Sequence, residues 1–168
     1  MDYYKYQDSL SDIYGYIFLE VEDGYAIRQI FKSSMGFIAS NRKDEEYDFL
    51  LSEGYLDFSG FESNVIKINP SKFNSVWLEY KKELLNEWEE TKNKFRINQE
   101  IMGTIEVFYP QGILINLENN IVAIADYEEC KNSTIPERLY PNHTIRAVIK
   151  GYDEENLWLI LKESMIID

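Results

Sequence analysis

The sequence predicts an α+β chain with three successive parts: a small mixed α/β unit over residues 1–68, a bridging amphipathic helix over 69–96 and a five-stranded β-barrel over 97–168. Two patterns lead to this prediction. In the last third of the chain, five short apolar runs alternate with turn residues, which is typical of a β-barrel or sandwich. Ahead of them, large apolar residues recur every three or four positions, as on one face of a helix. The 168 residues suffice for one large domain or two small ones.

The first part of the chain is expected to consist mainly of strands around one short helix. Apolar runs at 14–21 and 25–31 flank Asp23-Gly24, a dipeptide that favours a tight hairpin turn. Asp44 is a suitable helix N-cap because two glutamates follow it, and Gly54 would end that helix. Further short strands are expected at 36–40, 55–58 and 65–68.

The bridging helix is expected to run from Pro70 to about Phe95. Asn69 is a suitable N-cap, and Pro70 suits the first helical position because its missing N–H would have no partner there. Large apolar side chains at helical spacing favour core packing over a partner-binding groove. We therefore expect Trp77 and Trp88 to be buried between the two halves of the protein. The apolar face comprises Phe73, Val76, Trp77, Tyr80, Leu84 and Trp88.

The last part is expected to form five antiparallel strands closed on themselves, with polar turns at 110–111, 118–120 and 153–155. Gly103 and Gly112 fall at a strand start and at a turn, where close backbone approach or unusual dihedral angles favour glycine. The order and punctuation of the strands match an OB-fold, which is more often a binding fold than a catalytic one. The expected strands are 103–109, 112–117, 121–127, 145–152 and 156–162.

Several stretches of the barrel region share their order and spacing with a known module. They are Gly103-Thr104-Ile105, the runs 109–117 and 121–124, and the run 145–153 followed by 157–162. On these stretches, residues 88–163 resemble an S1-type RNA-binding domain, the OB-fold module named after a ribosomal protein. The helix before the barrel is similar to that of small bacterial proteins in which an S1-like domain follows an amphipathic helix.

The resemblance implies RNA binding on the barrel, although the chain departs from the family's pattern. Where S1-type domains carry aromatic residues that stack on bases, this sequence has Gln111 and Leu114, and Ala123 replaces a histidine. Stacking contributes about 1–3 kcal/mol per base, so we expect no tight binding of single-stranded RNA at physiological salt. The residues that would contact nucleic acid are Tyr109, Gln111, Leu114, Tyr127, Arg146, Lys150 and Lys162.

The acidic balance of the chain indicates a second kind of partner. The net charge is −13, which divides into −6 for residues 1–98 and −7 for residues 99–168. An acidic surface can meet a basic protein, as an immunity-type protein does when it masks a basic toxin or nuclease. The same charges can also serve solubility alone. The candidate contacts, expected to cluster in the barrel loops, are Glu118, Asp126, Glu128, Glu129, Asp153, Glu154 and Glu155.

No enzyme, metal site or cofactor is expected from the residues present. His143 is the only histidine and lies in a loop, where a solvated side chain is the ordinary case. Cys130 follows two glutamates, whose charge raises the pKa of the thiol and disfavours the nucleophilic thiolate. The acidic runs lack the alternating ligand spacing of a calcium loop, and no phosphate-binding glycine motif is present. The sequence therefore predicts a non-enzymatic binding protein.

The expected location is the cytoplasm. No apolar run approaches the roughly 18 residues that a membrane-spanning helix needs, so we expect no membrane partner. The N-terminus lacks the basic region and apolar stretch of a signal peptide. A single cysteine, Cys130, excludes a disulfide within the chain.

Overall fold

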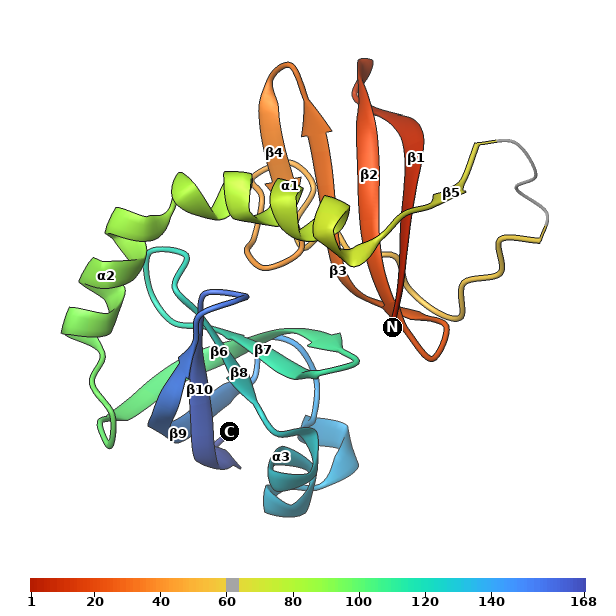
Figure 1. Cartoon of the computed structure of the whole chain (residues 1–168). Helices are drawn as coiled ribbons and strands as arrows, with labels where there is room; N and C mark the ends of the chain where they lie inside the picture. Colours follow the sequence, from red (N-terminus) through yellow and green to blue (C-terminus); the bar gives the residue numbers. More distant parts are fainter. Residues whose placement is uncertain (60–63) are drawn as a thin grey trace. The chain divides into compact units, whose positions relative to one another are not determined.

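A computed structural model of the chain describes residues 1–59 and 64–168, which divide into two compact units, Met1–Leu85 and Asn86–Asp168. The structure contains both helices and strands and ends in a closed five-stranded barrel, as the sequence predicts (Figure 1). None of the helices in the described ranges combines the length and apolar character that crossing a membrane requires.

The first unit is built on an antiparallel sheet with the strand order β4-β3-β2-β1-β5 (Figure 1). The hairpin at Asp23-Gly24 is confirmed: both residues have positive φ, 50° and 86°, as a tight turn of this kind requires. Strand β1, which pairs along its whole length with β2, is absent from the sequence prediction because its residues alternate poorly between apolar and polar. The strands are β1 (Asp2–Leu10), β2 (Ile13–Glu22), β3 (Tyr25–Ser33), β4 (Gly36–Ala39) and β5 (Ile66–Lys67).

Both faces of this sheet are covered. Helix α1 (Pro70–Lys82) begins as predicted, because the Asn69 side chain accepts a hydrogen bond of 2.9 Å from the Lys72 backbone N–H. Its apolar face packs against Phe18 and Ile30 of the sheet. The opposite face is packed against side chains of the segment that follows β4, namely Leu50, Leu51, Leu56 and Phe58.

The predicted helix from Asp44 to Gly54 is wrong. The Asp44 side chain does accept backbone hydrogen bonds from Glu46 and Tyr47, at 2.9 and 3.0 Å, but the turn ends in a bridge between Asp44 and Asp48. A short aspartate side chain can stabilise such a local turn in competition with a helix. Of the other predicted strands in this part, 55–58 is reduced to an isolated bridge between Tyr25 and Tyr55.

The predicted bridging helix is two helices, α1 and α2 (Leu85–Lys94). The last turn of α1 tightens, because Glu83 N donates to Tyr80 O and Leu84 N donates to Lys81 O, three residues back. Trp77 and Trp88 are buried as predicted, at 0% and 4% exposure, but each lies in the core of its own unit. Trp77 packs against the sheet, and Trp88 packs in the barrel core.

The second unit is a closed barrel with the strand order β10-β8-β7-β6-β9. The prediction of five antiparallel strands is wrong at one pair, because β8 and β10 run parallel, with Leu159 opposite Ala123. This pair closes the barrel. Its two strands are distant in sequence, and no local sequence pattern determines whether such strands run parallel or antiparallel. The strands are β6 (Glu100–Tyr109), β7 (Gly112–Asn116), β8 (Val122–Ala125), β9 (Thr144–Asp153) and β10 (Trp158–Ile166).

Two glycines and one helix shape this barrel. Gly112 opens β7 with a φ of 152°, as predicted for a turn. Gly103 lies inside β6 and not at its start, so that position was predicted wrongly, but the expected close approach is confirmed because a Cβ there would meet Ile115 Cγ2 at 2.6 Å. Helix α3 (Tyr127–Ser133), which the sequence analysis did not predict, and the short helix η1 (Pro136–Arg138) connect β8 to β9. A closed five-stranded barrel with this helical connection is compatible with an OB-fold.

Candidate nucleic-acid interface on the barrel

Three of the predicted nucleic-acid contacts lie together on the outside of the barrel. On β9, Ile145, Ala147 and Ile149 point into the core, so the alternate residues Arg146 and Lys150 point outward. On β10, Lys162 is paired in register with Val148, which lies between those two residues. The register of β9 and β10 shifts on either side of this pair, between Ile160 and Leu161 and between Lys162 and Met165. The three cations are neighbours on the outer surface of these two strands, and we call them the basic strip.

Among the residues that the structure describes, the basic strip forms no ion pairs. In the described part of the chain, no ion pair involves Arg146, Lys150 or Lys162, whereas Lys92 and Lys94 of α2 bind glutamates. Lys162 Nζ is 3.4 Å from Asn98 Oδ1. The strip therefore offers three cations to an anionic ligand from a barrel with an acidic net charge.

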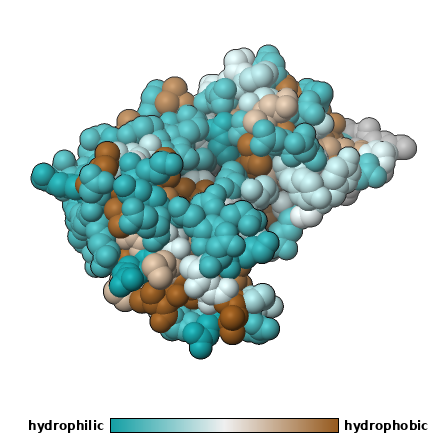
Figure 2. Space-filling model, turned by 90° about the horizontal axis from the view of Figure 1, so that it is seen from below, coloured by the Kyte–Doolittle hydropathy of each residue, from teal (hydrophilic) through white to brown (hydrophobic). Residues whose placement is uncertain are grey.

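The surroundings of Arg146 are apolar on both sides. Met102 of β6 and Met165 of β10 are its register partners, and both are exposed, at 60% and 45%. The guanidinium Nη2 lies 3.9 Å from Met165 Sδ. One carboxylate shares this surface, since Glu100 of β6 pairs with Val148. Figure 2 shows one face of the molecule, on which hydrophilic side chains predominate and separate smaller hydrophobic patches.

A pocket of about 400 Å³ at the connection between β8 and β9 is lined by aromatic rings. The Phe108 and Tyr127 rings meet edge to face, with centroids 6.4 Å apart. Lys131 Nζ lies 5.9 Å from the centre of the Tyr127 ring. Tyr140 is 60% exposed, so its ring is accessible to a stacking partner. The complete lining is Phe108, Tyr127, Lys131, Pro136, Leu139, Tyr140 and Pro141.

The other predicted nucleic-acid contacts are dispersed. Gln111 is exposed in the turn between β6 and β7, but Leu114 is fully buried. Tyr109 is also buried, and burial raises the pKa of its hydroxyl. A bulge between Ile105 and Val107 shifts the alternation of β6, and Phe108 rather than Tyr109 exposes its ring. Phe108 and Tyr140 were not predicted as contacts, because no local sequence pattern indicates the bulge in β6 or the path of the connection between β8 and β9.

The predicted acidic contacts are divided between the two ends of β8. At the end that leads into α3, Asp126 caps the helix by accepting a 2.9 Å hydrogen bond from Glu129 N. Glu129 in turn accepts a hydrogen bond of 3.1 Å from Ser164 N, and Glu128 lies 3.8 Å from Lys131. These carboxylates therefore have partners within the barrel unit itself.

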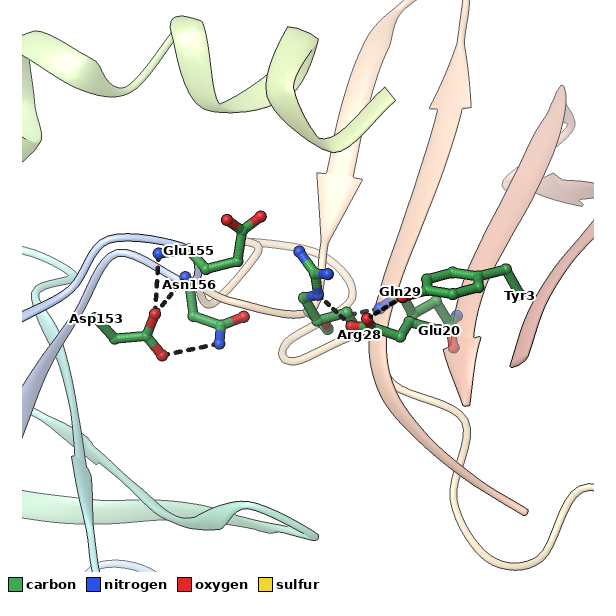
Figure 3. A network of polar contacts seen from close by, with 8 residues as sticks. Tyr3, Glu20, Arg28, Gln29, Asp153, Glu155 and Asn156 are labelled. Carbon is green, nitrogen blue, oxygen red and sulfur yellow. Dashed lines mark hydrogen bonds and ion pairs between the residues drawn. The ribbon is translucent and has the colours of Figure 1, made fainter. Parts of the chain in front are cut away.

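The remaining acidic contacts lie in the loops before β8 and between β9 and β10. Glu118 forms an ion pair with Lys94, and Glu154 accepts hydrogen bonds from Trp88 Nε1 at 2.7 Å and Lys92 Nζ at 2.9 Å. Asp153 organises its own turn by accepting hydrogen bonds from the backbone N–H groups of Glu155 and Asn156 (Figure 3). The seven residues do not gather into one acidic patch.

The candidate catalytic groups occupy ordinary structural positions. His143 Nδ1 lies 3.2 Å from Asp168 Oδ1, at the surface. Burial raises the pKa of the Cys130 thiol to about 12, and the charges of Glu129 and Asp126 add to this effect. Over the described residues, no three His, Cys, Asp or Glu side chains are arranged to hold a metal ion.

Comparisons with protein-family models, with curated proteins and with solved structures give no match for this chain. The S1-type resemblance consequently depends on the sequence stretches described above and on a barrel that is compatible with an OB-fold. The basic strip and the aromatic pocket are features of the structure that do not depend on that resemblance.

Proposed function

We propose that this chain is a non-enzymatic binding protein whose barrel binds single-stranded RNA weakly, mainly through the phosphate backbone. The observation that carries the proposal is the basic strip, in which Arg146, Lys150 and Lys162 share one outer surface with a single carboxylate, Glu100, and form no ion pair among the described residues. Phosphate contacts by lysine and arginine supply most of the sequence-independent affinity for nucleic acids. The S1-type resemblance supports RNA as the ligand, and the barrel is of a compatible fold.

The charge of the chain explains why the proposed binding is weak. A net charge of −13 repels a polyanion, and only three cations on the strip oppose that repulsion. Non-specific complexes of nucleic acids have dissociation constants of roughly 10⁻⁴ to 10⁻⁶ M at physiological salt, and we expect this chain to fall at the weak end. Gln111 and Leu114 stand where S1-type domains carry stacking aromatic residues, and neither side chain can stack on a base as an aromatic ring does.

The proposal is tested by removing charge from the strip. In a fluorescence-anisotropy titration with a labelled mixed-sequence RNA oligonucleotide, the double variant Arg146→Gln/Lys150→Gln should bind at least about fivefold more weakly than the native chain at low salt. The matched control is Lys72→Gln/Lys82→Gln, which removes the same charge from the exposed face of α1. The proposal would be contradicted if RNA binding were weakened equally in both double variants, or if it were weakened in neither of them.

A further inference from the structure

The first unit contains a separate cavity on the sheet face that lies opposite α1. Its volume is about 590 Å³, within the range of small-molecule sites. Its floor includes Leu19 of β2 and Tyr6 of β1, and its wall includes Tyr55 and Phe58 from the segment that follows β4. Leu19 is buried at 1% exposure and Phe58 packs against the same core, so the apolar surface is part of the folded sheet.

The charged groups of this cavity are all negative. Asp8 and Asp57 are among the lining residues, and the described lining contains no lysine, arginine or histidine. Neither carboxylate forms an ion pair in the described part of the chain. Lys67, on the neighbouring strand β5, is held by Asp2 at 2.7 Å. A cationic ligand would therefore meet two carboxylates that form no ion pair with any lysine, arginine or histidine among the described residues.

Both carboxylates interact with neighbouring side chains. Hydrogen bonds from Ser59 lower the pKa of Asp57, and the bond from the Ser59 side chain has a larger effect than the bond from its backbone. Burial raises the pKa of Tyr6, and the negative charge of Asp8 adds to this effect while a hydrogen bond with Ser52 opposes it. The negative charge of Asp8 therefore acts on the Tyr6 hydroxyl group, which belongs to the cavity lining.

The lining matches one class of ligand. Aromatic rings attract cations through their negative faces, and Tyr6, Tyr55 and Phe58 contribute three rings to the lining that also contains the two carboxylates. The volume exceeds what a compact ammonium group alone would fill, so an apolar chain belongs to the ligand as well. We propose that this cavity binds an alkylammonium group, whether it is a free amine or a lysine side chain of another protein.

Three probes of one chain length test this assignment. The full chain, labelled with nitrogen-15, is titrated with hexylammonium, hexan-1-ol and hexanoate, and backbone amide shifts are followed by NMR. We expect saturable shifts at Ser52 and Val65 with the cation, binding about tenfold weaker for the alcohol and none for the anion. Equal binding of the alcohol and the cation would overturn the proposal.

Variants separate the cavity from general charge attraction. Asp8→Asn/Asp57→Asn keeps the side-chain shapes and should reduce hexylammonium binding about tenfold, to the level of the alcohol. The matched control, Asp12→Asn/Glu53→Gln, removes two exposed charges of the same unit outside the cavity lining. The same loss in both double variants would overturn the proposal.

A second titration distinguishes the two sources of the ammonium group. The probe is lysine blocked as its Nα-acetyl N-methylamide. Binding similar to that of hexylammonium supports a protein side chain as the natural ligand, whereas selective binding of hexylammonium supports a free amine. Failure of both ammonium probes to shift the cavity amides would overturn the proposal, and this outcome is independent of RNA binding by the barrel.

Discussion

At the scale of single residues, the most unusual feature is a buried ion pair in the first unit. Glu20 and Arg28, on paired strands, bind each other, and Tyr3 donates a 2.9 Å hydrogen bond to Glu20 (Figure 3). The Arg28 guanidinium lies 4.9 Å from the Phe73 ring centre and 5.0 Å from that of Trp77. A charged pair beneath the helix α1 is stable only because each charge has a partner.

Breaking this pair should be costly. We predict that Arg28→Met lowers the free energy of unfolding by about 3–5 kcal/mol, because Glu20 is left buried without its cation. The double variant Glu20→Met/Arg28→Met should recover much of that loss. The control Lys32→Met removes a surface pair with Glu79 and should cost less than about 1 kcal/mol in urea denaturation. Equal losses for Arg28→Met and Lys32→Met would contradict the prediction.

Cys130 provides a test that depends on pH. Burial, with the charges of Glu129 and Asp126, raises the pKa of its thiol from 9.0 to about 12 in the folded chain. Above pH 9 the unfolded chain releases the thiol proton while the folded chain keeps it, so this contribution to stability is complete below pH 9 and is lost as the pH rises toward 12. Urea denaturation from pH 8 to pH 11 should show a steeper decline for the native chain than for Cys130→Ala. Parallel declines would show that the thiol does not titrate in this way.

At the scale of elements, strands and caps with local signals were predictable. The Asp23-Gly24 hairpin, the Asn69 cap and the five barrel runs each depend on neighbours in sequence. The parallel closure of β8 on β10 and the bulge in β6 depend on contacts between distant strands, and no local pattern encodes them. The sequence correctly predicted that the Asp44 side chain would accept backbone hydrogen bonds, as a helix cap does. No helix follows it, because the segment forms a turn instead.

The close approach at Gly103 gives the element-scale prediction. A Cβ at this position would lie 2.6 Å from Ile115 Cγ2 and 2.8 Å from Asn116 O, so β6 and β7 would have to separate. Gly103→Ala should therefore destabilise the chain by about 1–3 kcal/mol. The control is Gly151→Ala in β9, where a Cβ meets nothing within 4 Å and the effect should be near zero. Thermal unfolding of both variants measures the difference in stability. Equal stabilities would contradict the close packing of β6 against β7 at Gly103.

At the scale of the whole molecule, each unit has its own hydrophobic core and its own acidic surplus. Residues 1–85 carry 9 basic and 15 acidic side chains, and residues 86–168 carry 8 and 15. The sequence identified Arg146, Lys150 and Lys162 individually, but their common surface follows from the register of β9 and β10. The sequence could not indicate that Leu114 and Tyr109 would be buried, or that the acidic residues would lie at both ends of β8.

The salt dependence of RNA binding tests the central claim most directly. Each phosphate contact with a single strand contributes about −0.7 to the slope of log K against log salt concentration, so three contacts predict a slope of about −2. Arg146→Gln and Lys150→Gln should each make the slope shallower by about 0.7, with binding micromolar or weaker at physiological salt. A slope that these variants leave unchanged, or submicromolar binding without salt dependence, would contradict phosphate recognition by the basic strip.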